Sequence, residues 1–253
     1  MTSRVIIATV VAMAATVSPV RAQQSRTTAT IGLTQVVLEG RTIDFYLTRP
    51  EGEGTWPGIV LAHDRMGVDI ETKRLADRLA MEGFVVMAPD LFHGRIALEA
   101  DKGREMAAVL DEEDATLLLI EAAGYLKFLP EVGDHRAGLI GFDMGGRLAL
   151  LAGARSTDVS AVAAIDGRPV TDVDILRRIN VPIMGIFGEL DEQIPKAQVT
   201  AFKEGLDKAG RTSIVKVITG AGHGFMKQAD PGFKPDGMKE AWPALIAFLK
   251  GNL

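Results

Sequence analysis

The sequence predicts an α/β fold with a mostly parallel, doubly wound sheet and helices on both faces. Two observations support this fold class. Short apolar runs, typical of buried strands, alternate along the chain with longer segments whose apolar residues recur at helical spacing. Polar residues that can carry chemistry also follow directly after several of the apolar runs, where parallel strands place functional groups.

Each element has its own signal in the sequence. The first pair of strands alternates apolar and polar residues around Glu39-Gly40, which indicates a hairpin. The first helix has Leu75 and Leu79 four residues apart, and Gly83 stands where many helices end. In chain order we expect a hairpin in 33–50, a strand in 57–63, a helix in 69–84, a strand in 84–90, one or two helices in 100–129, a strand in 137–140, a helix in 145–154, strands in 161–166 and 181–188, a helix in 197–210, a strand in 213–219 and a helix in 236–250.

The first 22 residues are expected to be a secretory signal peptide rather than part of the fold. Arg4 precedes an apolar run, and Val20 and Ala22 occupy the small-residue positions of a cleavage site. The run is shorter than the roughly 20 residues that a membrane-spanning helix needs, which argues against an anchor. We therefore expect cleavage after Ala22, a periplasmic or secreted protein, and a single domain in residues 23–253 without a large cap domain.

Composition excludes several classes of function. The chain has no cysteine, so it offers no disulfide framework, no thiolate metal site and no thiol nucleophile. Its formal net charge of −5 gives no basic surface for nucleic acid or for an anionic membrane. No cluster of residues has the spacing of metal ligands, and no cofactor motif is present. We expect a small-molecule substrate, no cofactor, no metal, no nucleic-acid or membrane partner, and either a monomer or a dimer.

The stretch "LIGFDMGG" indicates a strand, a sharp turn and the start of a helix. Glycines at 141, 145 and 146 let the backbone turn tightly around Asp143, in the way that α/β-hydrolases present a nucleophile. The turn places Asp143 at a helix N-terminus, so the Met144 N–H can serve as an oxyanion donor. A second donor is expected from the loop after the strand "GIVLA", namely the Arg65 N–H.

Most of the chain after residue 22 resembles the dienelactone hydrolase family. The resemblance lies in the segments "AHDRMGV", "ADRLAMEGFVVMAPDLF", "GFDMGG", "FGELDEQIP" and "GAGHGF". It implies an α/β-hydrolase fold and hydrolase activity. By position, it makes Asp143 the nucleophile, Asp191 the triad acid and His223 the base. It also places Asp64 where the family has a glutamate that helps to control its cysteine, and Lys227 where the family can use a base to hold a substrate carboxylate.

The sequence departs from this family at the nucleophile, where Asp143 replaces the usual cysteine. A carboxylate that attacks an ester or lactone carbonyl would form an anhydride, from which the carboxylate leaves more readily than the alkoxide. Attack on a saturated carbon instead gives an ordinary ester on the enzyme, which His223 and water can cleave. The residues therefore predict a dehalogenase- or epoxide-hydrolase-like reaction through an alkyl-enzyme ester.

Other residues bear on the substrate. Neither tyrosine and neither tryptophan lies at a strand end, so the sequence offers no evident phenol or indole donor for a leaving group. Several cations follow strands and favour a small, anionic substrate. The substrate-binding candidates are Asp64, His93, Arg95, Arg168 and Lys227, with Arg65 as a further cation.

Three alternatives stay open at this stage. The chain could hydrolyse carboxylic esters or lactones, as its resemblance implies. It could be a catalytically silent binding protein, or an inactivated variant in which Asp143 replaces a cysteine or serine. Asp166 is a rival to Asp191 as the triad acid, because it also follows a strand. His63 is expected to hold the oxyanion loop rather than to react.

Overall fold

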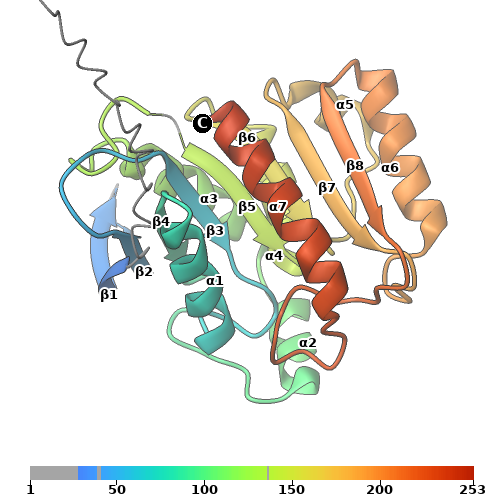
Figure 1. Ribbon diagram of the computed structural model, residues 1–253, viewed down its shortest axis with the longest axis horizontal. Coiled ribbons are helices and arrows are strands. Elements are labelled where there is room, and N and C mark those ends of the chain that lie inside the picture. Colours follow the sequence, from blue (N-terminus) through green and yellow to red (C-terminus); the bar gives the residue numbers. More distant parts are fainter. Residues whose placement is uncertain (1–27, 39–40, 136) are drawn as a thin grey trace, which may run out of the picture.

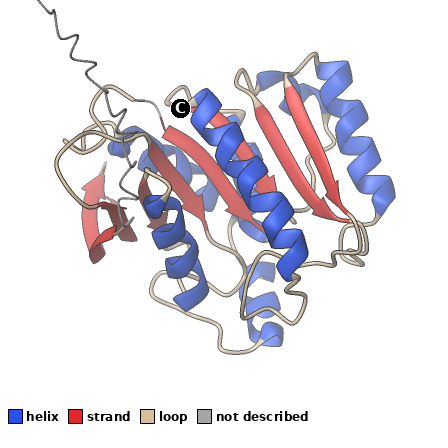
Figure 2. Cartoon of the chain, in the orientation of Figure 1, coloured by secondary structure: helices blue, strands red, loops and turns tan. Residues whose placement is uncertain are grey.

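The computed structural model describes residues 28–38, 41–135 and 137–253 (Figure 1). The expected signal peptide and its cleavage site therefore lie outside the described residues. Seven helices and eight strands follow one another along the described chain, with strands and helices alternating from β3 onward. Figure 2 shows the strands as one continuous sheet between helices.

The eight strands form a single sheet in the order β1-β2-β4-β3-β5-β6-β7-β8. β2 pairs antiparallel with β1 and with β4, whereas the six strands from β3 to β8 run parallel. The order therefore reverses at β3, as expected for a doubly wound sheet. The strands are β1 (Thr28–Leu38), β2 (Arg41–Pro50), β3 (Gly58–Ala62), β4 (Val85–Pro89), β5 (Ala137–Phe142), β6 (Val159–Ile165), β7 (Ile183–Gly188) and β8 (Ser213–Ile218).

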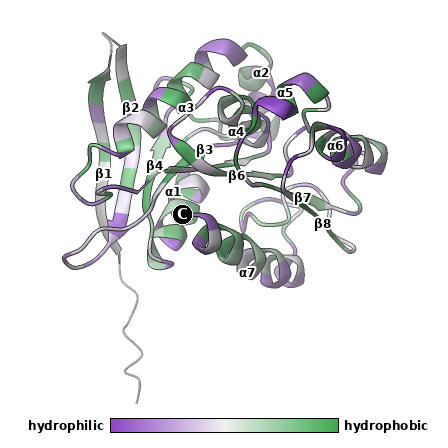
Figure 3. Cartoon of the chain, turned by 90° about the horizontal axis from the view of Figure 1, so that it is seen from above, coloured by the Kyte–Doolittle hydropathy of each residue, from purple (hydrophilic) through white to green (hydrophobic). Residues whose placement is uncertain are grey.

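Helices cover both faces of the sheet, which confirms the predicted fold class (Figure 3). Apolar residues of α1 and α7 pack in one core cluster, and those of α3, α4, α5 and α6 pack in the other. The helices are α1 (Ile70–Met81), α2 (Ala100–Ala108), α3 (Glu112–Leu126), α4 (Met144–Gly153), α5 (Val173–Arg178), α6 (Lys196–Ala209) and α7 (Pro235–Asn252).

Local sequence signals account for many of the helix ends. Asp69 precedes α1 and accepts a hydrogen bond from the Thr72 N–H at 2.8 Å, while Asp111 caps α3 in the same way. Gly83 has a positive φ of 102° and follows α1, as predicted from its position. Such caps satisfy N–H groups that have no partner within the helix.

The structure adds detail to the predicted elements. Residues 100–129 were expected to form one or two helices, and they form two, α2 and α3. The short helix α5 was not predicted, because its six residues are too few to show a helical period. None of the described helices is long and apolar enough to cross a membrane.

Candidate active site

A cavity of about 250 Å³ opens at the carboxyl edge of the parallel strands. The strand-end residues named in the sequence meet here, because β3, β5, β6 and β8 all release the chain at this edge (Figure 1). The residues that line it are Asp64, Arg65, Met66, Asp69, Glu71, Leu98, Ala100, Phe142, Asp143, Asp166, His223, Gly224, Met226, Lys227, Ala229, Asp230 and Pro231.

Asp143 sits on a strained turn between β5 and α4. Its φ of 51° and ψ of −118° are unfavourable for a residue with a side chain. The turn requires glycine on both sides: a Cβ on Gly141 would lie 1.9 Å from the Gly145 carbonyl oxygen, and a Cβ on Gly145 would lie 2.3 Å from that of Ala62. The sequence motif thus holds the Asp143 carboxylate at the edge of the cavity, ahead of the first turn of α4.

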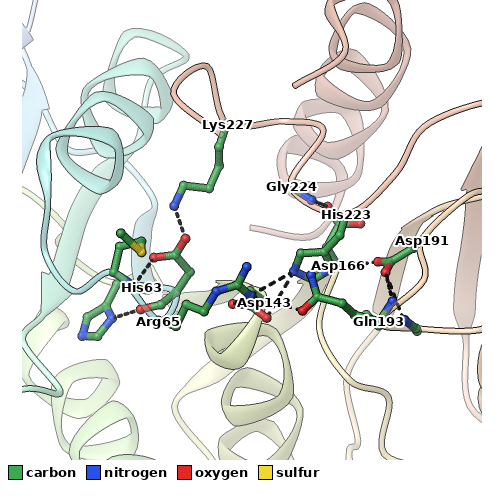
Figure 4. A network of polar contacts seen from close by, with 12 residues as sticks. His63, Arg65, Asp143, Asp166, Asp191, Gln193, His223, Gly224 and Lys227 are labelled. Atoms are coloured by element: carbon green, nitrogen blue, oxygen red, sulfur yellow. Dashed lines mark hydrogen bonds and ion pairs between the residues drawn. The ribbon is translucent and has the colours of Figure 1, made fainter. Parts of the chain in front are cut away.

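Asp143, His223 and Asp191 form a continuous chain of contacts (Figure 4). His223 Nε2 lies 3.3 Å from Asp143 Oδ1, and His223 Nδ1 lies 2.8 Å from Asp191 Oδ2. The other oxygen of Asp191 accepts hydrogen bonds from the Gln193 and Ile194 N–H groups, at 2.8 and 3.0 Å. Asp191 is therefore fixed by its own loop, and it in turn orients the imidazole.

Arg65 places a positive charge beside Asp143. From the sequence, Arg65 had been named only as an oxyanion donor, through its backbone N–H, and as a cation that could contact the substrate. Its Nη1 donates to Asp143 Oδ2 at 2.7 Å and lies 3.4 Å from Gln193 Oε1 (Figure 4). The contact joins residues 78 positions apart in the chain. Asp143 thus has a different positively polarised partner at each of its two oxygens.

These contacts set the charges in the site. Burial disfavours the charged form of Asp143, but the hydrogen bond from His223 and the positive charge of Arg65 outweigh it and lower the pKa of that carboxyl. Burial also opposes the charge on His223, yet its bonds to Asp143 and Asp191 raise the pKa of the imidazole to about 10. At neutral pH His223 is therefore an imidazolium between the two carboxylates of Asp143 and Asp191.

A second ion pair lies on the opposite side of the cavity. Lys227 Nζ bonds Asp64 Oδ2, and both side chains are buried. The other oxygen of Asp64 accepts from the Met66 N–H at 2.8 Å. Both residues were predicted to bind substrate, and both line the cavity. Lys227 can reach an anionic substrate only by sharing or leaving the carboxylate of Asp64.

His63 ties the loop after β3 to the loop after β4. Its Nδ1 lies 2.6 Å from the Asp64 carbonyl oxygen, and its Nε2 accepts from the Leu91 N–H at 3.0 Å. This pairing fixes a neutral ring with the proton on Nδ1. Burial also lowers the pKa of His63. The ring therefore supports the loop that carries Arg65, as the sequence had suggested.

The expected oxyanion donors lie at the ends of two different strands. Met144 is the first residue of α4, and Arg65 follows β3 by three residues. Both N–H groups belong to tight turns, in which the Asp143 carbonyl oxygen accepts from the Gly146 N–H at 3.0 Å and the Asp64 carbonyl oxygen accepts from the Gly67 N–H at 3.2 Å. Arg65 lines the cavity, whereas Met144 is not among its lining residues, so the role of both N–H groups as oxyanion donors stays a prediction.

Asp166 follows β6 and reaches the same cavity. It does not bond the His223 ring, so the structure favours Asp191 over this rival as the partner of Nδ1. Its Oδ2 instead accepts from the Gly224 N–H at 3.1 Å. Sequence reasoning had treated Asp166 only as a rival acid and had not foreseen this contact.

Three predicted substrate-binding residues do not line the cavity. His93 has a positive φ of 53° and is exposed, and Arg95 is also exposed, with its Nε bonded to the Phe92 carbonyl oxygen. Arg168 is exposed as well. These residues follow the ends of β4 and β6, but their side chains lie on the surface. They therefore lie outside the cavity lining, and their role in substrate binding stays a prediction.

No group of three or more side chains that could hold a metal ion occurs among the described residues. The two tyrosines and the two tryptophans do not line the cavity. Tyr46 bonds Asp77 at 2.8 Å, Tyr125 packs against Phe45, Trp56 contacts Arg49, and Trp242 packs under Arg78.

The family model of the dienelactone hydrolase family matches residues 43–253. The chain belongs to the dienelactone hydrolase family. A protein of Methylorubrum extorquens named as a carboxymethylenebutenolidase is 29% identical, over 96% of this chain and 90% of its own length. One of Salmonella typhimurium with the same name is 26% identical, over 85% of both chains.

Solved structures show the same fold. A protein from Klebsiella pneumoniae named as a dienelactone hydrolase superposes with a TM-score of 0.79 at 24% identity, covering 87% of this chain and 97% of that one. A dienelactone hydrolase-like promiscuous phosphotriesterase from metagenomic libraries gives a TM-score of 0.79 at 18% identity, over 89% and 99% of the two chains. This member of the dienelactone hydrolase family is thus an α/β-hydrolase-like protein and a hydrolase.

Proposed function

We propose that this hydrolase uses Asp143 as a nucleophile toward saturated carbon, with His223 and Asp191 completing a catalytic triad. One observation carries the proposal: a carboxylate stands at the tip of the strained turn, with the His223 imidazole 3.3 Å from it. The expected substrate is a small alkyl halide or epoxide. We further propose that the enzyme acts after export to the periplasm or the medium.

In the first step, one oxygen of Asp143 forms a bond to the substrate carbon while the carbon–halogen or carbon–oxygen bond breaks. The leaving group departs with the bonding electrons, and Asp143 becomes a neutral ester. No base is needed, because the lowered pKa keeps Asp143 ionised at neutral pH. A serine or cysteine at this position would instead need the histidine to remove its proton.

Ester formation then changes the charge on the base. The imidazole of His223 owes its raised pKa to Asp143 as well as to Asp191. Once Asp143 is an ester, the negative charge of that carboxylate is gone, so the pKa of His223 falls. Its proton passes to the departing oxygen of an epoxide, or to solvent when halide leaves. The neutral imidazole is then ready to act as a base.

In the second step, His223 removes a proton from water, whose oxygen attacks the carboxyl carbon of Asp143. The Met144 and Arg65 N–H groups are the donors that would stabilise the resulting oxyanion. The bond between that carbon and the alkyl oxygen breaks, and the alcohol leaves with a proton from His223. Asp143 is released as a carboxylic acid and returns to a carboxylate by giving its proton to His223, which becomes an imidazolium again. In sum, an alkyl halide and water give an alcohol, a proton and halide.

Two cations of the cavity favour an anionic substrate. Arg65 is bound through Nη1 alone among the described residues, which leaves its remaining N–H groups for a ligand. Lys227 lies across the cavity with its partner Asp64. A substrate carboxylate would share Arg65 with Asp143 or Lys227 with Asp64, and on this ground we include small halogenated acids among the expected substrates.

The second candidate is hydrolysis of an ester or lactone. The names of the Methylorubrum and Salmonella relatives favour it, since a carboxymethylenebutenolidase opens a lactone. In this chain such a reaction would have to use water activated by His223, with Asp143 as a neighbouring charge. A third candidate is a silent binding protein that has kept the cavity.

The deciding experiment uses His223→Ala and intact-protein mass spectrometry. The variant is incubated with chloroacetate, fluoroacetate, styrene oxide and a nitrophenyl ester. We expect turnover to fall by at least about a thousandfold, while an alkyl adduct accumulates on Asp143, because only the second step needs the base. Asp143→Asn is the matched control and should form no adduct.

Each other outcome identifies one of the alternatives. Full esterase activity in Asp143→Asn, with no adduct from any alkyl compound, would establish the ester or lactone hydrolase. Absence of both turnover and adduct in the wild-type protein would favour the silent binding protein or an inactivated variant.

A further inference from the structure

Asp166 is a buried carboxyl that the two proposed steps do not use. It follows β6 with a φ of 48°, in the left-handed region that residues with a side chain rarely adopt. Its N–H donates to the Ile186 carbonyl oxygen at 2.9 Å. The next residue packs against the Asp143 turn, where a Cβ on Gly167 would lie 2.8 Å from the Asp143 carbonyl oxygen. The backbone of Asp166 is therefore fixed from two sides.

The two oxygens of Asp166 have unequal surroundings. Oδ2 accepts from the N–H of Gly224, the residue directly after His223 (Figure 4). Oδ1 is buried and has no hydrogen-bond partner within the described part of the chain. A carboxylate oxygen in such a place is costly, because burial removes its water and nothing replaces it. A protonated carboxyl removes the charge that makes this burial unfavourable.

The charged groups around Asp166 come from three loops. His223 and Asp191 approach from the loops after β8 and β7, and Asp143 approaches from the turn after β5, while Arg65 and Lys227 line the same cavity. Burial, together with the carboxylates of Asp191 and Asp143, outweighs the attraction of His223 and raises the pKa of Asp166 to about 8. At neutral pH this carboxyl keeps its proton.

The state of Asp166 affects the base of the reaction. A negative charge on Asp166 stabilises the imidazolium of His223 and raises its pKa. The second proposed step needs His223 without its proton. An ionised Asp166 would therefore oppose that step, because its charge favours the protonated imidazole. Asp143 has the same effect only until it becomes an ester and loses its charge. When Asp143 is an ester and Asp166 is neutral, Asp191 is the carboxylate that remains bonded to the imidazole of His223.

We propose that Asp166 is a positioning residue that works as a neutral carboxylic acid. It holds the backbone beside His223 through Gly224, and it keeps a third negative charge away from the imidazole while His223 acts as a base. This inference rests on the proposed two-step function. The rate of the second step should therefore fall at alkaline pH as Asp166 loses its proton, whereas the rate of the first step should not.

The kinetic test follows adduct formation and adduct decay separately, by rapid quench and mass spectrometry, with chloroacetate or, if it forms no adduct, styrene oxide. In the wild-type protein, decay should slow as the pH rises and Asp166 loses its proton, whose pKa is about 8 in the unreacted enzyme. Asp166→Asn keeps an acceptor for the Gly224 N–H but cannot ionise, so its decay should not slow. Asp172→Asn, on an exposed helix cap, is the control and should behave as the wild type does.

A second readout does not depend on the proposed reaction. In an NMR titration of the imidazole, assigned with His223→Gln, the wild-type His223 signal should shift near pH 8 as Asp166 ionises, and Asp166→Asn should lose that shift and show a lower His223 pKa. If Asp166→Asn does not fold, Asp166→Ser takes its place.

Identical His223 titrations in the wild type and the variant would overturn the role of Asp166. So would equal slowing of adduct decay in both. If neither compound forms an adduct, the two-step function fails, and the NMR titration alone decides whether Asp166 is the neutral neighbour of His223.

Discussion

At the scale of single residues, one turn determines what the chemistry can be. The strained backbone of Asp143 and the glycines on either side place a carboxylate at the tip of a turn of the kind on which α/β-hydrolases present a nucleophile. Such strain persists only where the surrounding structure enforces it. The carboxylate is therefore held by the fold itself and by two partners, His223 and Arg65.

Gly145→Ala tests how tightly this turn is packed. The new Cβ would lie 2.3 Å from the Ala62 carbonyl oxygen, and backbone atoms cannot move aside as a flexible side chain can. We expect a loss of about 1–3 kcal/mol in the free energy of unfolding, together with loss of any adduct on Asp143. Gly251→Ala is the control, since nothing lies within 4 Å of its Cβ. Equal denaturation midpoints for both variants would contradict the tight turn.

The raised pKa of His223 also predicts how stability depends on pH. The imidazole has a pKa of about 10 in the folded protein against 6.5 for the unperturbed group. Its contribution to stability is therefore complete below pH 6.5 and is lost as the pH rises toward 10. The advantage of the wild type over His223→Gln should shrink as the pH rises above 6.5, before Asp166 begins to lose its proton near pH 8. Urea unfolding at several pH values measures this, and a constant difference would refute it.

The sequence predicted the local motifs, but it did not predict in which direction long side chains point. The turn around Asp143 is specified by neighbouring glycines, and the order of Asp191 and His223 follows from strand ends. The reach of Arg65 to Asp143 depends on the packing of two loops 78 residues apart. Arg168 also follows a strand end, yet it points to solvent. A strand-end position places a backbone at the cavity edge and does not fix the direction of its side chain.

At the scale of elements, capped helices and fully buried strands were predicted well. Every residue of β3, β4, β5 and β7 is buried, which explains why these strands appear as short, continuous apolar runs. The helix α5 was missed because a single turn and a half shows no period. The pairing of β2 with β4 was likewise out of reach, because the sequence does not state which strands lie side by side.

Asp111→Ala tests the cap of α3, the helix that packs beside β3 and β5. Asp111 Oδ1 accepts from the Glu113 and Asp114 N–H groups at 3.0 and 3.1 Å, so the variant leaves two donors without this partner. The expected loss is about 0.5–2 kcal/mol in the free energy of unfolding. Asp207→Ala, exposed in the last turn of α6, is the control and should cost nothing. The cap would be irrelevant if both variants unfolded at the same urea concentration.

At the scale of the whole molecule, the parallel sheet gathers distant segments at one edge. The cavity combines residues from the loops after β3, β5, β6 and β8, and Asp191 joins from the loop after β7. No short segment of the chain could form this site alone. The fold thus accounts for the position of the functional groups, while the charges among them account for the proposed order of the two steps.

The last prediction concerns the N-terminal segment, which lies outside the described residues. Residues 1–22 combine Arg4, an apolar run and small residues at 20 and 22, the pattern of a cleaved signal peptide. The match to the family begins only at residue 43, so removal of this segment should leave the hydrolase domain intact. We expect the protein recovered from the periplasm of a bacterial host to begin at Gln23, within one or two residues, by N-terminal sequencing and mass. Replacing Ala22 with a large residue such as Leu should slow cleavage, because the peptidase accepts only small side chains there. Membrane-bound protein that retains Met1 would show instead that the segment is an anchor.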